Sequence, residues 1–287
     1  MKRIILLLFL FAFYLQQYGQ PIINISPTLR VTSAPPASDY SDEFQAVYDA
    51  MATKPHDTLA AKLNTMVEYL VDNNSTWDSI AVFYAFAVDD SVDAKLEWTA
   101  PTGSNTATLD GGVAWTPYEG FLGNNSDGKV DLNWNPSTEG EGLFQQDAAG
   151  FGVYVMEDYN ENEPAAALST SCSIFPRSSG AIYGRINCAA SDTWTVDESS
   201  GITILVRDNS TTKHAYRNTT DLGDKSRSSA AVANADFEVC SIAGIPNYGR
   251  YTVAFFIAGG QFSDAQVSTI VTALETYMDS NGKGVIP

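Results

Sequence analysis

The sequence predicts an all-β protein: an antiparallel two-sheet β-sandwich with a short helical segment before it and a helix at its C-terminal end. From Trp77 onward, short segments rich in β-branched and aromatic residues alternate with clusters of Gly, Asn, Asp and Ser, as in IAVFYAFA, FGVYVME, GITILVRD and RYTVAFFIA. That spacing is typical of sandwiches and barrels. No crossover helix separates these segments, which argues against a parallel α/β sheet.

Length and composition agree with a single large sandwich. The chain has 287 residues, of which 44% are hydrophobic and 17% charged, and one all-β domain commonly has about 200 to 250 residues. We divide the chain into a signal peptide (1–20), a proline-rich linker (21–38), a helical segment that packs on the sandwich (39–76) and the sandwich itself (77–287).

The N-terminal residues have the pattern of a secretory signal peptide. Lys2 and Arg3 precede an apolar run from Ile4 to Leu15, and the polar stretch QQYGQ follows, with Gly19 as a plausible cleavage point. The apolar run is shorter than the roughly 20 residues that span a bilayer. We therefore expect a secreted or cell-surface protein with no membrane span in the mature chain. The alternatives are a retained N-terminal anchor and a misassigned start.

Two short helices are expected in front of the sandwich and one after it. Ser41 precedes DEFQAVYDAM, which has acidic residues in its first turn and apolar residues at helical spacing. Pro55 breaks this helix, and Asp57 can cap a second one. The apolar face of the second helix consists of Leu59, Leu63, Met66, Val67 and Leu70. Ser263 is the natural N-cap of a helix that ends before Gly282.

The charge balance excludes one class of partner. The formal net charge is −18, whereas proteins that bind nucleic acids or anionic lipids need clustered Lys and Arg. The acidity could attract divalent cations, or it could serve only to keep the surface soluble.

The three cysteines are too few for a disulfide framework. Cys172 and Cys188 could pair across neighbouring strands, which export would permit. The alternative is that they are buried free thiols, which behave as small hydrophobic side chains.

Three stretches resemble one fold family. GFLGNNSDGKVDLNWNPST (120–138) resembles the opening of laminin-G-like, concanavalin A-like lectin/glucanase domains, with a glycine-rich turn, a strand and an Asn-Pro turn. RYTVAFFIAGGQFSDAQVSTIVTALETYM (250–278) resembles their last strand and the helix that follows it, and FGVYVME (151–157) resembles the strand between. The pattern is also similar to domains of phage and bacterial surface proteins, and it covers residues 39–287. It implies a jelly roll that binds ligands on a concave face or in rim loops, sometimes beside calcium.

Motifs for catalysis are absent. The E-x-D-x-x-E pattern of glycosidases with this fold does not occur, although hydrolysis of a glycosidic bond needs two carboxylates a few ångströms apart. There is no G-x-S-x-G, H-E-x-x-H, G-x-G-x-x-G or P-loop motif, and His56 and His214 are expected at the surface. Whether the protein is an enzyme stays undecided, and the sequence favours a non-catalytic role without a required cofactor.

Calcium is the one metal that the sequence suggests. Asp158, Asn160 and Asn162 alternate as oxygen ligands do at the start of a calcium loop, but Glu163 stands where such a loop has glycine. A second oxygen-rich stretch offers Asp127, Asp131 and Asn133 as its candidate ligands. The alternative for both is turn chemistry, in which Asp and Asn bind their own backbone.

Aromatic residues near loops are the candidate ligand-binding residues. Trp115 and Tyr118 lie in AWTPYEGF, a proline-containing stretch, and Trp134 and Asn133 lie in DLNWN. A flat ring can stack on a pyranose while Asn and Asp bind its hydroxyl groups. Packing in the core is the alternative for Trp134.

These observations support three functions. The first is a secreted or virion-surface lectin-like module that binds a carbohydrate or cell-surface polymer without catalysis. The second is a structural sandwich that self-associates or assembles in a phage particle or cell envelope. The third is a glycan hydrolase or lyase with a non-standard site. The first predicts exposed aromatic rings beside a groove, the second a flat apolar patch, and the third paired carboxylates in a cleft.

Overall fold

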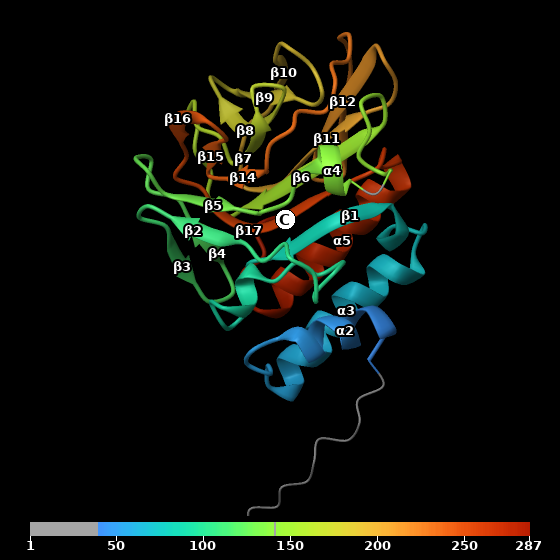
Figure 1. The fold of residues 1–287 in the computed structure, drawn as a ribbon, viewed down its shortest axis with the longest axis vertical. Coiled ribbons are helices and arrows are strands. Elements are labelled where there is room, and N and C mark those ends of the chain that lie inside the picture. The colour runs from blue at the N-terminus through green and yellow to red at the C-terminus, as the bar shows by residue number, and fades with distance from the viewer. Residues whose placement is uncertain (1–39, 141) are drawn as a thin grey trace, which may run out of the picture. The chain divides into compact units, whose positions relative to one another are not determined.

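The structure is a computed structural model that describes residues 40–140 and 142–287 (Figure 1). Two large antiparallel sheets, preceded and followed by helices, confirm the predicted all-β sandwich. The signal peptide and the linker predicted over 1–38 lie outside the described residues. Among the described helices, none has the length and apolar character that crossing a bilayer requires.

The first sheet, sheet A, is built around two long buried strands. Its strands, in order of neighbours, are β13 (Thr220–Ser226), β12 (Thr212–Arg217), β11 (Gly201–Arg207), β6 (Ala149–Val155), β17 (Thr252–Gly259), β4 (Gly120–Leu122) and β3 (Ala114–Thr116). In addition, β1 (Ile80–Ala85) pairs with the second half of β17.

The second sheet, sheet B, contains mostly short strands. In order they are β10 (Asp192–Thr195), β9 (Ala181–Arg185), β8 (Cys172–Ser178), β7 (Ala166–Ser169), β14 (Glu238–Val239), β5 (Lys129–Asp131) and β2 (Thr108–Asp110). A separate two-stranded hairpin consists of β15 (Ser241–Ile242) and β16 (Ile245–Tyr248).

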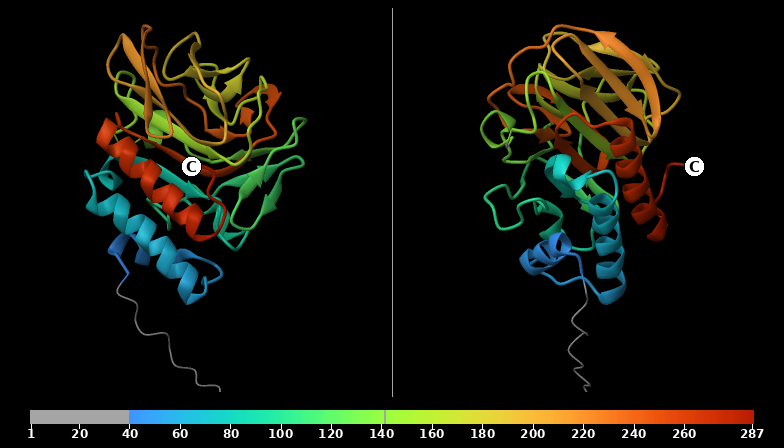
Figure 2. Two further views of the ribbon diagram at one scale, coloured as in Figure 1. Left: turned by 180° about the vertical axis from the view of Figure 1, so that it is seen from behind. Right: turned by 90° about the vertical axis from the view of Figure 1, so that its right-hand side faces the viewer.

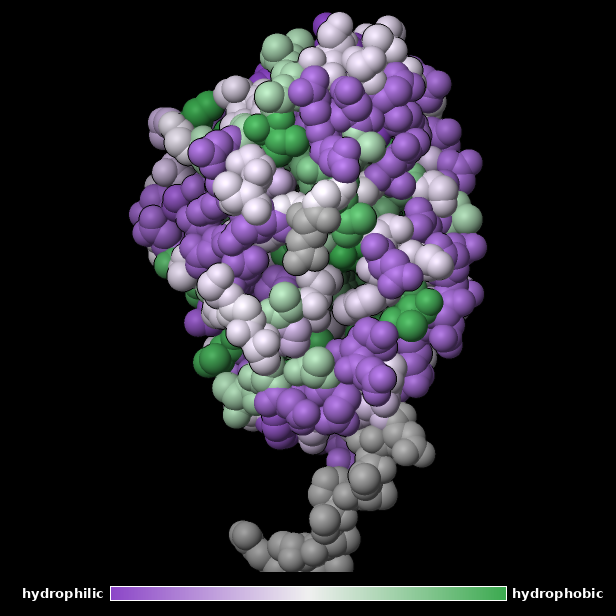
Figure 3. Space-filling view, turned by 45° about the vertical axis from the view of Figure 1, so that its right-hand side comes forward, coloured by the Kyte–Doolittle hydropathy of each residue, from purple (hydrophilic) through white to green (hydrophobic). Residues whose placement is uncertain are grey.

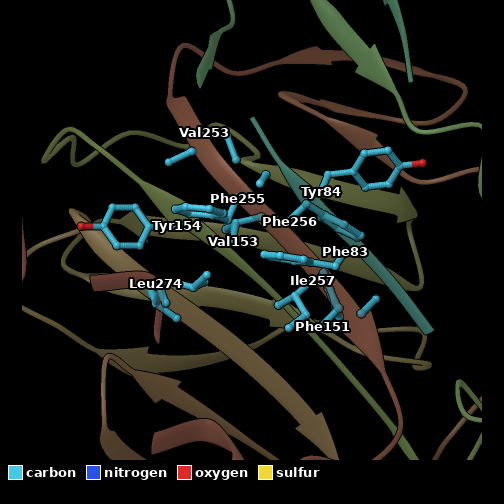
Figure 4. Packing of buried hydrophobic residues seen from close by; sticks show 14 of the residues in the cluster. Phe83, Tyr84, Phe151, Val153, Tyr154, Val253, Phe255, Phe256, Ile257 and Leu274 are labelled. Carbon is cyan, nitrogen blue, oxygen red and sulfur yellow. The ribbon is translucent and has the colours of Figure 1, made fainter. Parts of the chain in front are cut away.

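The space between the sheets is filled by aromatic side chains that alternate along the strands. Phe151 of β6 and Phe256 of β17 point toward sheet B, where their ring centroids lie 5.2 and 5.1 Å from that of Phe237. Tyr154 is three positions from Phe151 and Phe255 is one position from Phe256, and both point to the other side of sheet A (Figure 4). This period of two is the alternation that the sequence shows in FGVYV and VAFFI.

Helix α5 (Asp264–Ser280) packs on the outer face of sheet A. The ring of Tyr277 contacts Phe255 edge to face at 5.9 Å, and Tyr154 Oη donates to Glu275 Oε2 at 2.6 Å. Ser263 caps the helix in a capping box with Gln266, as the sequence predicts. Figure 2 shows α5 on the side of sheet A away from sheet B.

Two N-terminal helices add a further layer. α2 (Asp42–Ala50) has Ser41 as its N-cap, and α3 (Asp57–Asp72) lies beside α5. The N-cap of α3 is His56, whose Nδ1 accepts from Leu59 N at 3.3 Å, so Asp57 is the first helical residue and not the predicted cap. His56 is exposed, as expected.

Short helical turns connect these elements. They are the 3₁₀ turns η1 (Trp77–Ser79) and η2 (Asp93–Lys95), and the single-turn helix α4 (Pro136–Glu139). Asp93 of η2 ties the N-terminal layer to the sandwich, because its carboxylate accepts from Ala52 N at 2.6 Å and from Thr53 N at 3.1 Å.

All three cysteines are free and buried. Cys172 Sγ contacts Asn187 Oδ1 at 3.1 Å, and Cys188 Sγ contacts the carbonyl oxygen of Ala190 at 3.2 Å. Burial raises the pKa of the Cys172 thiol to about 12. Of the two alternatives for this pair, the structure therefore contains the buried thiols.

The surface is dominated by polar side chains. Figure 3 shows one face of the molecule, where hydrophilic residues prevail and apolar residues form only small separate groups.

Removal of the α5 cap provides a first test of the fold. We expect Ser263→Ala to lower the free energy of unfolding by about 1 kcal/mol, because it leaves the Gln266 N–H of the first turn without its acceptor. Urea denaturation of the variant and the parent measures this loss. Ser263→Asp keeps an acceptor at the cap and is the matched control, so an equal loss in both variants would contradict the capping role.

Candidate functional site

The outer face of sheet B is the main candidate for a ligand-binding surface. The side chains of Ile174 and Ile182 point inward, and a Cβ added at Gly184 would also point inward and lie only 2.8 Å from Leu205 of sheet A. Because successive side chains of a strand point to opposite faces, the residues between them point outward. The layer of α5 and α3 covers sheet A and not this face.

Two aromatic rings stand directly opposite each other on this face. Phe175 of β8 and Tyr183 of β9 are register partners, and Thr193 of β10 is the next partner of Tyr183. Phe175 and Tyr183 are half-buried, and neither belongs to the side chains that pack on the core. They therefore present ring surface to solvent at positions that the sandwich interior does not require.

A polar row runs beside the aromatic pair. It crosses six strands in continuous register through Thr108, Asp131, Glu238, Ala167, Ser173 and Arg185. At one end, Arg185 Nη1 donates to the carbonyl oxygen of Thr170 at 2.7 Å and Nε donates to Ser191 Oγ at 3.1 Å. At the other end, the row is acidic.

The acidic end has a defined electrostatic character. Glu238 is buried and binds Lys129 Nζ through Oε1 at 2.6 Å, while its Oε2 accepts from Ser241 Oγ. Burial raises the pKa of Asp236 above its ordinary value, and the carboxylates of Asp131, Glu139 and Glu238 raise it further. The row thus runs from carboxylates through the buried side chains of Ala167 and Ser173 to an arginine, so its two ends are the parts that a hydroxyl-rich ligand can contact.

The predicted rim aromatics lie elsewhere, at the edge of the sandwich. Trp115 of β3 and Tyr118 in the turn that follows are half-buried and pack on the core. Trp115 Nε1 donates to the carbonyl oxygen of Phe86 at 3.0 Å, and Tyr118 has a positive φ of 63°. Trp115 and, through its backbone N–H to the carbonyl oxygen of Val88, Tyr118 therefore both bond the segment that follows β1.

Trp134 and Asn133 have structural partners. Trp134 is 1% exposed and stacks on Phe237 at 5.8 Å, so its ring has no face open to a ligand. Asn133 Nδ2 donates to the carbonyl oxygen of Thr106 at 2.6 Å. Core packing, which the sequence left open as the alternative for Trp134, is what the structure shows.

The first predicted calcium stretch uses its oxygen atoms within the protein. Asp158 accepts from Arg177 Nη1 at 3.1 Å and from Ser199 N at 2.8 Å, which lower its pKa despite its partial burial. Asn160 Oδ1 accepts from Gly180 N at 2.8 Å, and Asn162 is exposed. These contacts are turn and ion-pair chemistry.

The second predicted stretch divides into two separate turns. Asp127 Oδ1 accepts from Asn124 Nδ2 at 2.7 Å and from Gly112 N at 3.2 Å. Asp131 Oδ1 accepts from Asn133 N at 2.9 Å. The two carboxylates therefore serve different backbone segments.

Phe175, Tyr183 and Arg185 were missed by the sequence analysis. The available signal was the alternation in SIFPRS and AIYGR, where aromatic and arginine residues occupy one face of each strand. Phe175 and Tyr183 lie opposite each other only in one register of β8 against β9, and the sequence alone does not reveal that register.

Comparison with known proteins supports the fold alone. No family model and no curated protein sequence matches the chain. The receptor binding domain of botulinum neurotoxin C/D mosaic serotype matches with a TM-score of 0.51 and 10% identity over 68% of this chain and 51% of that chain. The binding domain of botulinum neurotoxin serotype D matches with a TM-score of 0.50 and 10% identity over 69% of this chain and 53% of that chain.

A third solved structure comes from a different kind of protein. A mutant of Trypanosoma rangeli sialidase that displays trans-sialidase activity matches with a TM-score of 0.50 and 11% identity over 80% of this chain and 39% of that chain. The chain thus spans about half, or less, of the solved chains it matches. At these identities, what the chain shares with them is the β-sandwich fold.

Proposed function

We propose that the protein is a secreted, lectin-like module that binds a glycan across the outer face of sheet B. The observation that carries this proposal is the register pair Phe175 and Tyr183, two half-exposed rings on a rigid sheet that the core does not use. Beside them, Arg185 and Thr193 offer donors and acceptors for sugar hydroxyl groups. Calcium has no necessary part in this arrangement.

The similar folds agree with this proposal without establishing it. Two of the matched structures are binding domains, one of them a receptor binding domain, and the third is a sialidase. The same sandwich therefore occurs in proteins that bind receptors and in a protein that processes glycans. Because a fold does not determine a function, the proposal depends on the residues of this face.

Tyr183→Ala should weaken glycan binding by about 10-fold or more, since truncation of an aromatic anchor commonly costs over about 1.4 kcal/mol. Phe175→Ala should have a similar effect, and Tyr183→Phe should retain most of the affinity because the ring remains. The measurement is a glycan array followed by titration of the best ligand, first with the parent chain.

The controls separate this face from the other surfaces. Tyr69→Ala removes the same side chain from a 39% exposed position on α3 and should leave binding unchanged. Trp115→Ala tests the rim site at the sandwich edge. Loss of binding in the Trp115 variant alone would move the site to that rim, and absence of any glycan ligand for the parent chain would favour the structural module.

One observation favours hydrolysis as a second candidate function. Asp236 has a raised pKa beside Asp131 and Glu139 at the acidic end of the same face, and glycoside cleavage uses a pair of neighbouring carboxyl groups, one of which has a raised pKa. Release of reducing ends from the array ligand by the parent chain would support this candidate.

A further inference from the structure

A histidine and two aspartates meet on the outer face of sheet A, outside the surface proposed for glycans. Asp208 directly follows β11, His214 is in β12, and Asp224 is in β13, so two adjacent strands and the end of a third bring the three side chains together. His214 and Asp224 are direct register partners. The labels β11 and β12 in Figure 1 mark this part of the sheet.

The ligand atoms of this cluster are spaced for a shared cation. His214 Nδ1 lies 2.9 Å from Asp208 Oδ2 and 3.7 Å from Asp224 Oδ1, and the three atoms lie within 4.8 Å of one another. Ligands at about 2.0 to 2.1 Å from a tetrahedral zinc ion are themselves about 3.3 Å apart. The cluster therefore needs only small side-chain shifts to bind one ion.

The charges around the cluster are unbalanced in a way that a cation would correct. Asp192, Asp158 and Glu238 each contact a lysine or arginine. Within the described residues, Asp208 and Asp224 have no Lys or Arg partner, and His214 is their only charged contact.

One nitrogen of His214 faces both carboxylates. Its Nδ1 lies within 3.7 Å of the nearest carboxylate oxygen of each aspartate, while Nε2 is buried and has no hydrogen-bond partner among the described residues. Nδ1 is therefore the ring nitrogen that the cluster offers to a cation, and histidine is the commonest metal ligand.

A further contact holds one carboxylate in place. Gln261 Nε2 donates to Asp208 Oδ1 at 3.0 Å and leaves Oδ2 directed at His214. Outer contacts of this kind orient metal ligands and are typical of metal sites.

We infer that Asp208, His214 and Asp224 form a binding site for a divalent transition metal of the zinc type. One nitrogen and two carboxylate oxygens suit such a metal better than calcium, which takes six to eight oxygen ligands. Three protein ligands leave a coordination position open for water or an external ligand. The site is independent of the glycan proposal, since it uses none of the same residues.

Titration of the metal-free, untagged full chain with Zn²⁺ by calorimetry tests the inference. We expect one saturable site per chain, and an increase in Tm of about 5 to 10 °C at a Zn²⁺ concentration 100 times Kd. Asp224→Asn and His214→Asn should each weaken binding by at least about 10-fold, the lower bound for loss of even an outer-shell contact. Asp224 is largely exposed, so its variant should fold normally.

Two matched controls exclude unspecific binding. His56→Asn changes the chain's other histidine in the same way and keeps a capping side chain, and Asp221→Asn removes the same charge from the same strand. Both controls should bind Zn²⁺ as the parent does. Parent-like affinity in Asp224→Asn and His214→Asn, no saturable Zn²⁺ binding by the parent, or binding of Ca²⁺ but not Zn²⁺ would each overturn the inference.

Discussion

Replacing Asp192 by Ala is expected to lower the free energy of unfolding by about 3 to 5 kcal/mol, because it leaves a buried ammonium group without its counter-charge. The Lys213 side chain is fully buried between the sheets, and its Nζ lies 3.0 Å from Asp192 Oδ2. Its other contacts are the carbonyl oxygen of Gly184 at 2.9 Å, Cys188 Sγ at 3.3 Å and the ring of Trp194. None of these carries a full negative charge.

Chemical denaturation of three variants separates the buried pair from its exposed neighbour. Arg227, whose side chain is 39% exposed, also binds Asp192, and Arg227→Met should cost less than about 1 kcal/mol. The double variant Asp192→Ala/Lys213→Met should recover most of the lost stability, since apolar replacements of buried ion pairs are often neutral. An Asp192→Ala variant as stable as the parent would contradict the assigned role.

The same pair should respond to acid. Burial of Asp192 favours its neutral form, but Arg227 and Lys213 lower its pKa more, to below the ordinary value of 3.8. The contribution of the pair to stability is then fully present above pH 3.8 and is lost as the pH falls through the folded pKa. The stability difference between the parent and Asp192→Ala should therefore shrink at low pH.

Much of the fold follows from local patterns in the sequence. The period of two in FGVYV and VAFFI places strands β6 and β17, and the serines at positions 41 and 263 cap their helices as predicted. The boundary of α3 differs by one position because His56, which has an extended backbone, accepts the hydrogen bond that Asp57 was expected to accept. Caps and alternation are local properties, so a sequence states them directly.

The candidate sites depend on which strands pair and in what register. Asp131 meets Glu238 through the pairing of two strands that are distant along the chain, and Asp208 meets His214 across the turn between the consecutive strands β11 and β12. Neither contact leaves a motif in the sequence. Trp134 illustrates the same limit, since the ring that stacks on it, Phe237, is distant along the chain. An aromatic residue near a turn looks the same in sequence whether a distant strand covers it or not.

The buried carboxylate of Glu97 underlies the second large effect. Glu97 is 3% exposed and has no Lys or Arg partner among the described ion pairs. Its Oε1 accepts from Phe83 N at 3.0 Å, Thr99 N at 2.8 Å and Thr99 Oγ1 at 2.7 Å, and its Oε2 accepts from Ala100 N at 2.5 Å. The Glu97 side chain thus accepts hydrogen bonds from the backbone of β1, at Phe83, and from the backbone of the segment that follows Trp98, at Thr99 and Ala100.

We expect Glu97→Ala to lower the free energy of unfolding by about 3 kcal/mol, because it leaves the buried N–H of Phe83 and the partly buried N–H groups of Thr99 and Ala100 without acceptors. The Tm should fall by about 6 to 12 °C. Differential scanning calorimetry measures the change, and Glu68→Ala on α3 is the matched control, with an expected effect within about 0.5 kcal/mol.

The pH dependence of this loss distinguishes the Glu97 carboxyl group from simple packing. Burial raises the pKa of Glu97 above its ordinary value of 4.5, although the hydrogen bonds from Thr99, Phe83 and Ala100 lower it in part. Ionisation is therefore harder in the folded state, and the stability that the group contributes is fully present below pH 4.5 and decreases as the pH rises through the folded pKa. The advantage of the parent over Glu97→Ala should be largest at acidic pH. A loss that stays constant across this range would contradict the raised pKa of Glu97 in the folded state.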